Sequence, residues 1–395
     1  MTALAVAALS CGIWIYLLAA RGGFWHAAQR DDEPVPMFPQ DIAWPRVAAV
    51  IPARDEAGLI RGTLVALLKQ DYRGDFTVIV VDDHSSDDTG GAARRAAKAA
   101  GASDRVTVLA APSLPEGWTG KLWATHLGIK HVQALPEPPQ YLLLTDADIR
   151  LADDMLTTLV RRAVRDRLVL TSLMAKLRCS SFAERVTIPA FVFFFQMLYP
   201  FAWVNRPDRK TAAAAGGCML VERQSLQAAG GHEAIRGELI DDCALARLLK
   251  RHGPIWLGLS ERAHSARAYS SIDDVRRMII RCAYAELKFS PWWLAAAAAA
   301  MAVTFLAPPL LTLRGSGATQ ILAALAWAQM ALAMQPTLRF YGLSRWWGLA
   351  LPAIGGIYLV FTVDSAYHHL RGRGGEWKGR IHRHATSHEL PGHGN

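Results

Sequence analysis

Cysteine is scarce in this sequence. The chain has five cysteines among 395 residues, and no two of them form a C-x-x-C pair. They are Cys11, Cys179, Cys218, Cys243 and Cys282. Such scattered cysteines argue against both a disulfide framework and a zinc knuckle, and they fit a reducing compartment.

Charge is missing from four long stretches of the chain. Each stretch is close to the roughly 20 residues that a helix needs to cross a bilayer. The stretches are Ala3 to Ala20, Phe289 to Leu313, Gly315 to Leu338 and Trp346 to Val363. The first has neither a positively charged start nor an evident small-residue cleavage site, so we predict that residues 1–22 form an anchor rather than a removed signal peptide.

A stripe of basic residues interleaved with aromatic residues is also missing. Its absence argues against nucleic acid as a partner, in spite of the net charge of +9. Many of the basic residues instead flank the apolar stretches. They include Arg21, Arg30, Arg276, Arg277, Arg281, Lys288, Arg371, Arg373, Lys378, Arg380 and Arg383. Basic residues in such positions meet anionic lipid on the cytoplasmic leaflet and set the orientation of a membrane protein.

Strand and helix patterns alternate over residues 46–270, after a proline-containing linker over residues 23–45. The predicted strands lie in 46–54, 76–83, 105–112 and 141–148, and helices are predicted over 58–70 and 87–101. This alternation predicts an α/β fold with a mostly parallel, Rossmann-like sheet and helices on both of its faces. Ligands bind such sheets at the carboxyl ends of the strands.

The segment 187–205 is uncharged and long enough to span a membrane, but Pro189 and Pro200 interrupt it. We therefore predict a broken helix that lies at the membrane interface and forms a hydrophobic lip of the soluble domain. If this segment crossed the membrane, everything after it would lie on the opposite side from Asp146.

The rest of the chain is predicted to return to the membrane. We expect an amphipathic interfacial helix over 271–290, transmembrane helices over 291–370 and a basic polar tail over 371–395. If all three late apolar stretches cross, the tail lies opposite the soluble domain, which conflicts with the positive-inside tendency. One stretch, for example the short Trp346 to Val363, is then re-entrant or interfacial.

Acidic residues follow two of the predicted strands. Asp82 and Asp83 end the second strand, and Asp146 and Asp148 end the strand that begins at Tyr141. Residues two apart on a strand project from the same face, so Asp146 and Asp148 would repel each other unless they share a cation. A divalent ion that prefers oxygen, Mg²⁺ or Mn²⁺, fits such a pair. The alternative is that the second Asp caps a helix that starts nearby.

Five short stretches occur in order along the soluble region: "IPARDEA" at 51–57, "VDDHSSDDT" at 81–89, "GWTGKLWA" at 117–124, "TDADI" at 145–149, and the segment 216–246 that begins "GGCMLVE". Together they resemble a family 2 glycosyltransferase with the GT-A fold. With the flanking apolar segments and the tail "EWKGR", the whole chain resembles the hopene-associated membrane glycosyltransferases of bacteria, which are close to the ceramide glucosyltransferase-like enzymes.

The resemblance implies a set of donor-binding residues. It implies that Asp148 is the more direct metal ligand and that Asp146 lies nearer the ribose. It also implies a nucleotide-binding turn, a carboxylate that accepts a hydrogen bond from the nucleobase, and a lysine that faces the nucleotide. These are Pro52, Arg54 and Glu56 in the turn, Asp83 with Asp82 beside it at the base, and Lys121 at the phosphates. For Lys121 the alternative is a solvated lysine at a helix start. Gly216 and Gly217 would let the backbone approach the donor closely. The alternative for these glycines is an ordinary tight turn.

The catalytic base is predicted at the start of a later helix. Asp241 and Asp242 begin that helix, where the dipole favours negative charge. In the family the second of these residues is the base, which implies Asp242, with a supporting role for Asp241. The Gln-x-x-Arg-Trp motif of related polymer synthases is incomplete, because Met278 and Cys282 replace Gln and Trp while Arg281 remains. This departure favours a single transfer, and Arg281 faces either the donor diphosphate or anionic lipid.

The resemblance implies an inverting transfer of a sugar from a nucleotide-diphosphate sugar, such as a UDP-hexose, to a lipid. The acceptor is a hopanoid, a polyprenyl phosphate or a ceramide-like lipid. We expect the enzyme in the bacterial inner membrane, with its catalytic domain in the cytoplasm. Two other classes fit parts of the pattern. An aspartyl phosphatase also uses D-x-D, but on its first strand, and an inactive membrane scaffold would not need the complete acidic set.

Overall fold

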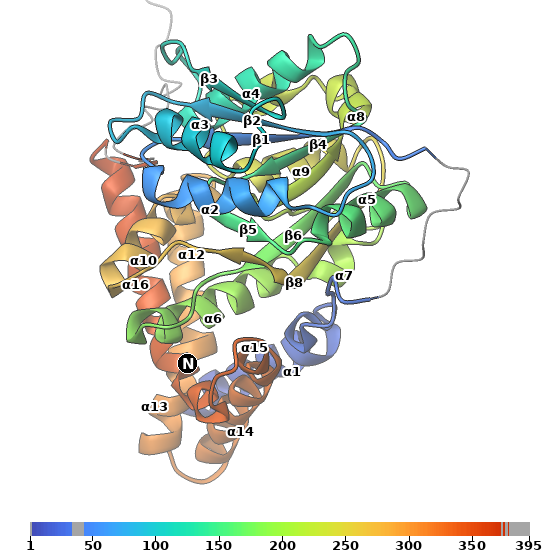
Figure 1. Ribbon diagram of the computed structural model, residues 1–395. Coiled ribbons are helices and arrows are strands. Elements are labelled where there is room, and N and C mark those ends of the chain that lie inside the picture. Colours follow the sequence, from blue (N-terminus) through green and yellow to red (C-terminus); the bar gives the residue numbers. More distant parts are fainter. Residues whose placement is uncertain (1, 34–42, 373, 376–377, 379–395) are drawn as a thin grey trace, which may run out of the picture.

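The computed structural model describes residues 2–33, 43–372, 374, 375 and 378 (Figure 1). Its strands form a single sheet in the order β3-β2-β1-β4-β7-β6-β8-β5. They are β1 (Val47–Ala53), β2 (Phe76–Asp82), β3 (Val106–Ala110), β4 (Tyr141–Thr145), β5 (Ile149–Leu151), β6 (Leu170–Lys176), β7 (Cys218–Glu222) and β8 (Ile255–Ser265). Strands β3, β2, β1 and β4 run parallel, as do β6 and β8, whereas β7 is antiparallel to both of its neighbours and β5 to β8. The mixed, mostly parallel sheet and its four predicted strands are confirmed.

Helices cover both faces of the sheet (Figure 1). They include α2 (Ala57–Leu68), α3 (Thr89–Ala99), α4 (Gly120–Gln133), α5 (Met155–Arg165), α8 (Arg223–Ala228) and α9 (Asp241–Leu249). Alternation along β1 divides the core in two: Ala48 and Val50 pack in the core that contains α4, whereas Ala49 and Ile51 pack in the core that contains α2. This is why β1 reads as a continuous apolar run with no polar face.

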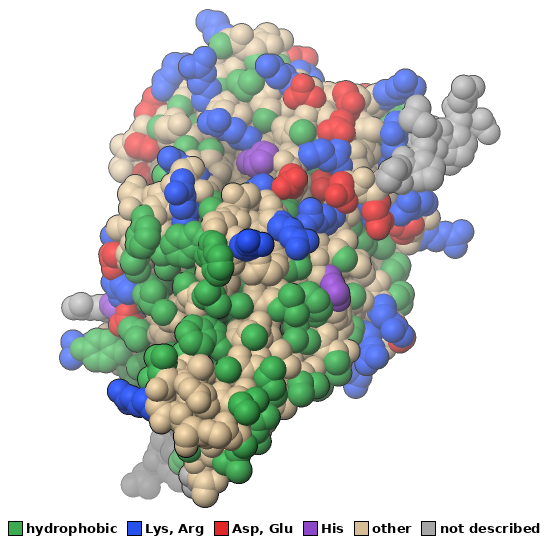
Figure 2. Space-filling view, turned by 90° about the horizontal axis from the view of Figure 1, so that it is seen from below, with side chains coloured by type: hydrophobic (Ala, Val, Ile, Leu, Met, Phe, Trp, Pro, Cys, Tyr) green, Lys and Arg blue, Asp and Glu red, His purple; other side chains and the backbone are tan. Residues whose placement is uncertain are grey.

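Apolar helices extend from one side of this sheet domain. They are α1 (Ala3–Ala20), α12 (Pro291–Met301), η3 (Ala302–Leu306), α13 (Ala307–Arg314), α14 (Gly317–Ala333), α15 (Gln335–Phe340), η4 (Arg345–Ala350) and α16 (Leu351–Leu370). Together with the segment 182–204, they supply five stretches of the described chain that are long and apolar enough to cross a membrane. Seen from below, much of their surface is hydrophobic, while charged side chains gather toward one edge (Figure 2). Large side chains exposed there include Trp292, Leu313, Ile321, Trp346 and Val360. The helices support membrane association.

The predicted lip forms helix α6 (Phe182–Leu198) followed by the single turn α7 (Phe201–Val204). The sequence-based expectation that Pro189 interrupts the helix is wrong, because α6 continues through this buried proline. The helix ends only before Pro200, where the break was also expected. Packing on both sides stabilises α6: Phe193 meets Phe24 of η1 (Phe24–His26), and the Tyr358 hydroxyl of α16 donates to the Thr187 carbonyl at 2.8 Å. Whether α6 lies at the membrane interface stays a prediction.

The end of α16 returns to the sheet domain. It packs against α10 (Ile272–Ile280) and α11 (Ala283–Glu286), and Arg276 of α10 forms an ion pair with Asp364. The Ser365 hydroxyl donates to the Ile280 carbonyl at 2.6 Å. Because α12 follows directly after α11, the chain leaves and re-enters the domain on the same side. The three late apolar segments therefore begin and end beside the sheet domain, and the number of complete crossings stays a prediction.

This arrangement decides where the beginning of the tail lies. The described tail residues Gly374, Gly375 and Lys378 line the same pocket as Asp146. The arrangement in which all three stretches cross and the tail lies opposite the active site is thus contradicted. The short apolar stretch Trp346 to Val363 lies in the turn η4 and in helix α16, which has 20 residues. Most of the tail, including residues 379–395, and part of the linker, residues 34–42, lie outside the described residues.

Candidate active site

A pocket of about 770 Å³ lies beyond the carboxyl ends of β1 and β4. Most of the predicted site residues line it, as do several residues that the sequence did not single out. The predicted ones are Pro52, Arg54, Glu56, Lys121, Asp146, Asp148, Gly216, Gly217, Asp242 and Arg281. Asp82, Asp83 and Asp241 do not line it directly. The elements that supply these residues are far apart in the sequence and meet at one edge of the sheet, as the βα pattern predicts.

Lys121 connects the two acidic pairs. It sits at the start of α4, whose first turn is capped by the Thr119 side chain. Its ammonium lies 3.0 Å from Asp146 Oδ1 and 3.2 Å from Asp241 Oδ2. Burial lowers the pKa of Lys121, but Asp146 and Asp241 outweigh burial and raise the pKa above its ordinary value. Lys121 is therefore a charged, largely buried lysine in the site and not a solvated one.

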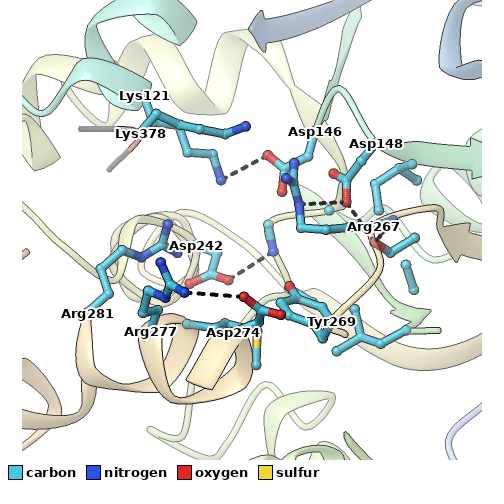
Figure 3. Close-up of a pocket in the computed structure, with 18 of the residues that line it drawn as sticks. Lys121, Asp146, Asp148, Asp242, Arg267, Tyr269, Asp274, Arg277, Arg281 and Lys378 are labelled. Atoms are coloured by element: carbon cyan, nitrogen blue, oxygen red, sulfur yellow. Dashed lines mark hydrogen bonds and ion pairs between the residues drawn. The ribbon is translucent and has the colours of Figure 1, made fainter. Parts of the chain in front are cut away.

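Asp146 and Asp148 lie in a turn rather than on the strand. Strand β4 ends at Thr145, so the expectation that the strand pleat aligns the two carboxylates is wrong. The turn nevertheless directs both into the pocket (Figure 3). Asp148 accepts a hydrogen bond from the Ser265 hydroxyl at 2.7 Å and pairs with Arg267 at 3.3 Å. It does not cap a helix, because α5 begins after Asp154.

The carboxylates of Asp146 and Asp148 suit a divalent ion that takes its remaining ligands from water and substrate. Across the described chain, no three His, Cys, Asp or Glu side chains form a metal-binding group. Burial and the nearby charge of Asp148 raise the pKa of Asp146, while Lys121 opposes them. Mg²⁺ commonly takes one or two carboxylates and fills its other positions with water and substrate phosphates. Asp146 and Asp148 offer that donor set.

The turn after β1 is fixed by charged contacts. The Arg54 guanidinium donates to the backbone carbonyls of Asp83 and His84, which ties the ends of β1 and β2 together. Glu56 is 7% exposed and contacts two cations, Arg267 and Lys378. Arg54 and Glu56 therefore reach the pocket as predicted, within a network that also holds Asp148 through Arg267.

The carboxylates that end β2 are turned away from the pocket. Asp82 accepts from the backbone N–H of Ser85 at 3.0 Å and of Gly90 at 3.2 Å, so it shapes the loop before α3. Asp83 is fully buried beside Arg54, with 3.9 Å between the charged groups. Its predicted contact with the nucleotide base stays a prediction.

Asp242 faces the pocket from the first turn of α9. Its Oδ2 accepts from the Gly216 backbone N–H at 2.9 Å, and its Oδ1 accepts from the Cys243 N–H at 2.7 Å. Burial, with a further contribution from Asp241, raises the pKa of Asp242 to about 6. For Asp241, burial also raises the pKa, but Lys121 and Arg281 outweigh it and hold the pKa below its ordinary value. Two neighbouring carboxylates thus differ, with Asp242 the better proton acceptor near neutral pH.

The two glycines before β7 allow this close packing. A Cβ on Gly216 would lie 3.2 Å from the Lys121 ammonium and 3.4 Å from Asp242 Oδ2. A Cβ on Gly217 would lie 3.1 Å from Ile149 Cδ1, and the Gly217 carbonyl accepts from the Thr145 hydroxyl at 2.7 Å. The glycines are therefore needed for the approach of β7 to the acidic groups, which is more than an ordinary tight turn requires.

Arg277, which precedes the incomplete motif, and Arg281, which lies within it, differ in their surroundings. Arg277 is 65% exposed and pairs with Asp273 at 2.9 Å, so it is a surface residue at the rim. Arg281 lines the pocket, and within the described chain no hydrogen-bond partner reaches its buried Nε. Its charge influences both Asp241 and Lys121. An unpaired guanidinium nitrogen directed at this site is suited to a phosphate.

The opposite end of the pocket is apolar. Its lining side chains come from β6, the connection after it, α6 and α10: Met174, Leu177, Phe191, Phe195 and Met278. Because α6 and α10 also pack against the apolar helix α16, this end faces the membrane side of the molecule. The pocket thus has a charged end at Asp146 and an apolar end at α6.

Sequence reasoning missed Ser265, Arg267, Tyr269 and Lys378, all of which line the pocket. Arg267 follows the carboxyl end of β8, which is the same kind of position as Asp146 after β4, but β8 itself was not predicted as a strand. Lys378 lies more than 100 residues further along the chain, and local sequence carries no signal for its return to the turn after β1.

Residues 48–230 match the family model described as Glycosyl transferase family 2. This part of the chain is therefore similar to family 2 glycosyltransferases, and the predicted GT-A fold is confirmed. The mannosyltransferase PcManGT from Pyrobaculum calidifontis, in complex with GDP-Man and Mn2+, is similar in structure, with 20% identity, a TM-score of 0.52, and coverage of 91% of this chain and 99% of that chain.

A weaker likeness is to mannosyl-3-phosphoglycerate synthase from Rubrobacter xylanophilus, with 16% identity, a TM-score of 0.37, and coverage of 60% of this chain and 71% of that chain. Another is to S. aureus TarS 1-349 in complex with UDP, with 14% identity, a TM-score of 0.36, and coverage of 83% of this chain and 92% of that chain. None of the curated proteins matches the sequence.

Proposed function

We propose that this protein is a membrane-bound, inverting glycosyltransferase that moves one hexosyl unit from a nucleotide-diphosphate sugar to a lipid. The observation that carries the proposal is the pocket with two unlike ends. Its charged end places Lys121 and Arg267 beside the carboxylates of a metal-binding pair, and its apolar end reaches α6. A charged donor and an apolar acceptor would meet between these ends, where Asp242 lies.

The transfer needs one base and one stabilised leaving group. The acceptor hydroxyl oxygen attacks the anomeric carbon, and its proton passes to the Asp242 carboxylate. The bond between the anomeric carbon and the diphosphate oxygen breaks, and the diphosphate leaves with the electron pair. In-line attack inverts the anomeric centre. A divalent ion, when bound at Asp146 and Asp148, neutralises charge on the diphosphate.

The protein's own cations would complete the leaving-group site. Lys121 and Arg281 lie on the side of the pocket that carries the base, and Arg267 lies beside Asp148 (Figure 3). Fixed cations stabilise developing negative charge without reorganisation during the reaction. Met278 and Cys282, in place of the Gln and Trp of polymer synthases, support a single, non-processive transfer.

The donor has two candidates and the acceptor has three. A UDP-hexose is our first donor, and GDP-mannose is the second because the similar mannosyltransferase binds GDP-Man. A hopanoid hydroxyl is our first acceptor, which needs only the apolar end of the pocket. A polyprenyl phosphate is the second, because the unpaired Nε–H of Arg281 would donate a hydrogen bond to its phosphate. A ceramide-like lipid is the third acceptor and, like a hopanoid, needs only the apolar end of the pocket.

We place the enzyme in the bacterial inner membrane, with the catalytic domain and the start of the tail in the cytoplasm. The family 2 match argues against the phosphatase alternative, and the intact acidic set argues against an inactive scaffold. The test is transfer of radiolabelled sugar from UDP-glucose, UDP-N-acetylglucosamine or GDP-mannose into lipid extract by the purified protein. Label in an organic-soluble product supports the proposal, and phosphate release without transfer would replace it with a phosphatase.

A further inference from the structure

Lys378, beyond α16, lines the pocket and contacts the turn after β1. Gly372 and Gly375 adopt φ angles of 69° and 70°, a left-handed conformation that glycine adopts readily and that turns the chain back toward the sheet. Lys378 Nζ then lies 2.8 Å from Glu56 Oε1 and 3.1 Å from the Asp55 carbonyl oxygen. The Arg54 guanidinium donates to the Lys378 carbonyl at 3.1 Å. The tail is thus held at both its side chain and its backbone.

Lys378 belongs to a network of two cations and two carboxylates. Its carboxylate partner Glu56 is shared with Arg267, and Arg267 in turn pairs with Asp148. One buried carboxylate therefore faces two cations on the donor side of the pocket. The Lys378 side chain is 25% exposed, so it remains accessible to a ligand from the pocket. It extends toward Asp146 and Asp148 from the same side as Lys121 (Figure 3).

We propose that Lys378 is a donor-binding residue, and that the carboxyl-terminal tail carries it across the pocket mouth to contact the phosphates of a bound nucleoside diphosphate. This inference rests on the proposed function and adds to it a residue from outside the family 2 segment. An ammonium is a compact point charge on a flexible stem, which suits a phosphate that arrives from solvent. Glu56 and Arg54 hold the tail in place before the donor enters.

The contrary possibility is that the tail blocks the pocket. In that case the ion pair between Lys378 and Glu56 would have to break before a nucleotide binds, and removing the lysine would strengthen binding. The two possibilities thus predict changes of opposite sign in the same measurement.

The test compares nucleoside diphosphate affinity of the full chain and its variants by titration calorimetry in Mg²⁺. Lys378→Ala should weaken UDP or GDP binding about tenfold, because a charge-assisted hydrogen bond is lost. Lys378→Arg should retain most of the affinity, and the nucleoside without phosphates should bind both forms equally. The matched control is Lys98→Ala, which removes an exposed lysine at the end of α3 and should change nothing.

Turnover separates donor binding from a structural role. Lys378→Ala should raise the KM for the donor by a similar factor and leave the KM for the acceptor unchanged. Unchanged or tighter nucleoside diphosphate binding by Lys378→Ala would overturn the inference and leave the proposed function standing. If the wild-type chain bound neither UDP nor GDP, the proposed function itself would fail, and the two failures are therefore distinguishable.

Discussion

Replacing Asp242 by Asn tests the assignment of the catalytic base. Asn keeps the shape of the side chain but accepts no proton from the attacking hydroxyl. General-base assistance contributes typically 10²–10⁴ in rate, so kcat should fall by about this factor, or about 3–5 kcal/mol of transition-state free energy. Because Asp242 does not pair with the metal ligands, affinity for UDP or GDP should persist.

The structure also bounds the cost of the substitution to folding. Both carboxylate oxygens of Asp242 accept a backbone N–H, at 2.9 Å from Gly216 and 2.7 Å from Cys243. Asn retains one oxygen, so one of these N–H groups loses its acceptor, at a cost of about 1–3 kcal/mol. The variant should therefore remain folded with a lowered melting temperature, which separates lost catalysis from lost structure.

The pH profile gives an independent signature of the same residue. Since the pKa of Asp242 is raised to about 6, the carboxylate is charged above this pH and protonated below it. The wild-type kcat/KM should fall as pH decreases through about 6, and this acid limb should vanish in Asp242→Asn. Asp241→Asn should keep an acid limb but move it to lower pH, because the charge of Asp241 contributes to the raised pKa of Asp242. Near-normal turnover of Asp242→Asn, or loss of nucleotide affinity equal to that of Asp148→Asn, would refute the assignment and make Asp241 the next residue to test.

Two further predictions concern the metal and the membrane. Transfer should stop in EDTA and return with Mg²⁺ or Mn²⁺. Asp148→Asn should weaken UDP or GDP affinity only when metal is present. Full activity in EDTA would contradict the predicted metal site. Reporters at Arg178 and Asp208, and a third fused after residue 395, should show the same protease protection, since we predict that α6 does not cross and Lys378 lies at the pocket. Opposite protection of the first two would contradict both the lip and the catalytic assignment.

Local sequence was sufficient to predict strands β1 to β4 of the sheet and the acidic residues that follow β2 and β4. The strands around Asp82 and Asp146 are short apolar runs that end in acidic residues, so their positions follow from hydrophobic pattern and turn chemistry alone. Lys121 and Asp242 were identified from the family resemblance, and both lie in the first turn of a helix.

Long-range contacts were beyond such reasoning. Arg267 and Lys378 reach Glu56 from distant parts of the chain, and only the folded chain shows that they share one carboxylate. Pro189 was expected to break α6, but the helix is packed on several sides and tertiary contacts outweigh the lost hydrogen bond. The tail was difficult to place because hydropathy detects candidate spans, and the number of complete crossings depends on how those spans pack.

The most direct test of the central claim is a single-turnover assay with the purified protein in liposomes that contain candidate lipids. Each donor, labelled in its sugar, is incubated with Mg²⁺, and the organic phase is analysed by mass spectrometry and by the anomeric configuration of the product. We predict one lipid product that carries one hexose with inverted configuration, and no such product from Asp242→Asn. Label that stays entirely in the aqueous phase with every donor and lipid, or a polymer of sugars on the lipid, would contradict a single inverting transfer to lipid.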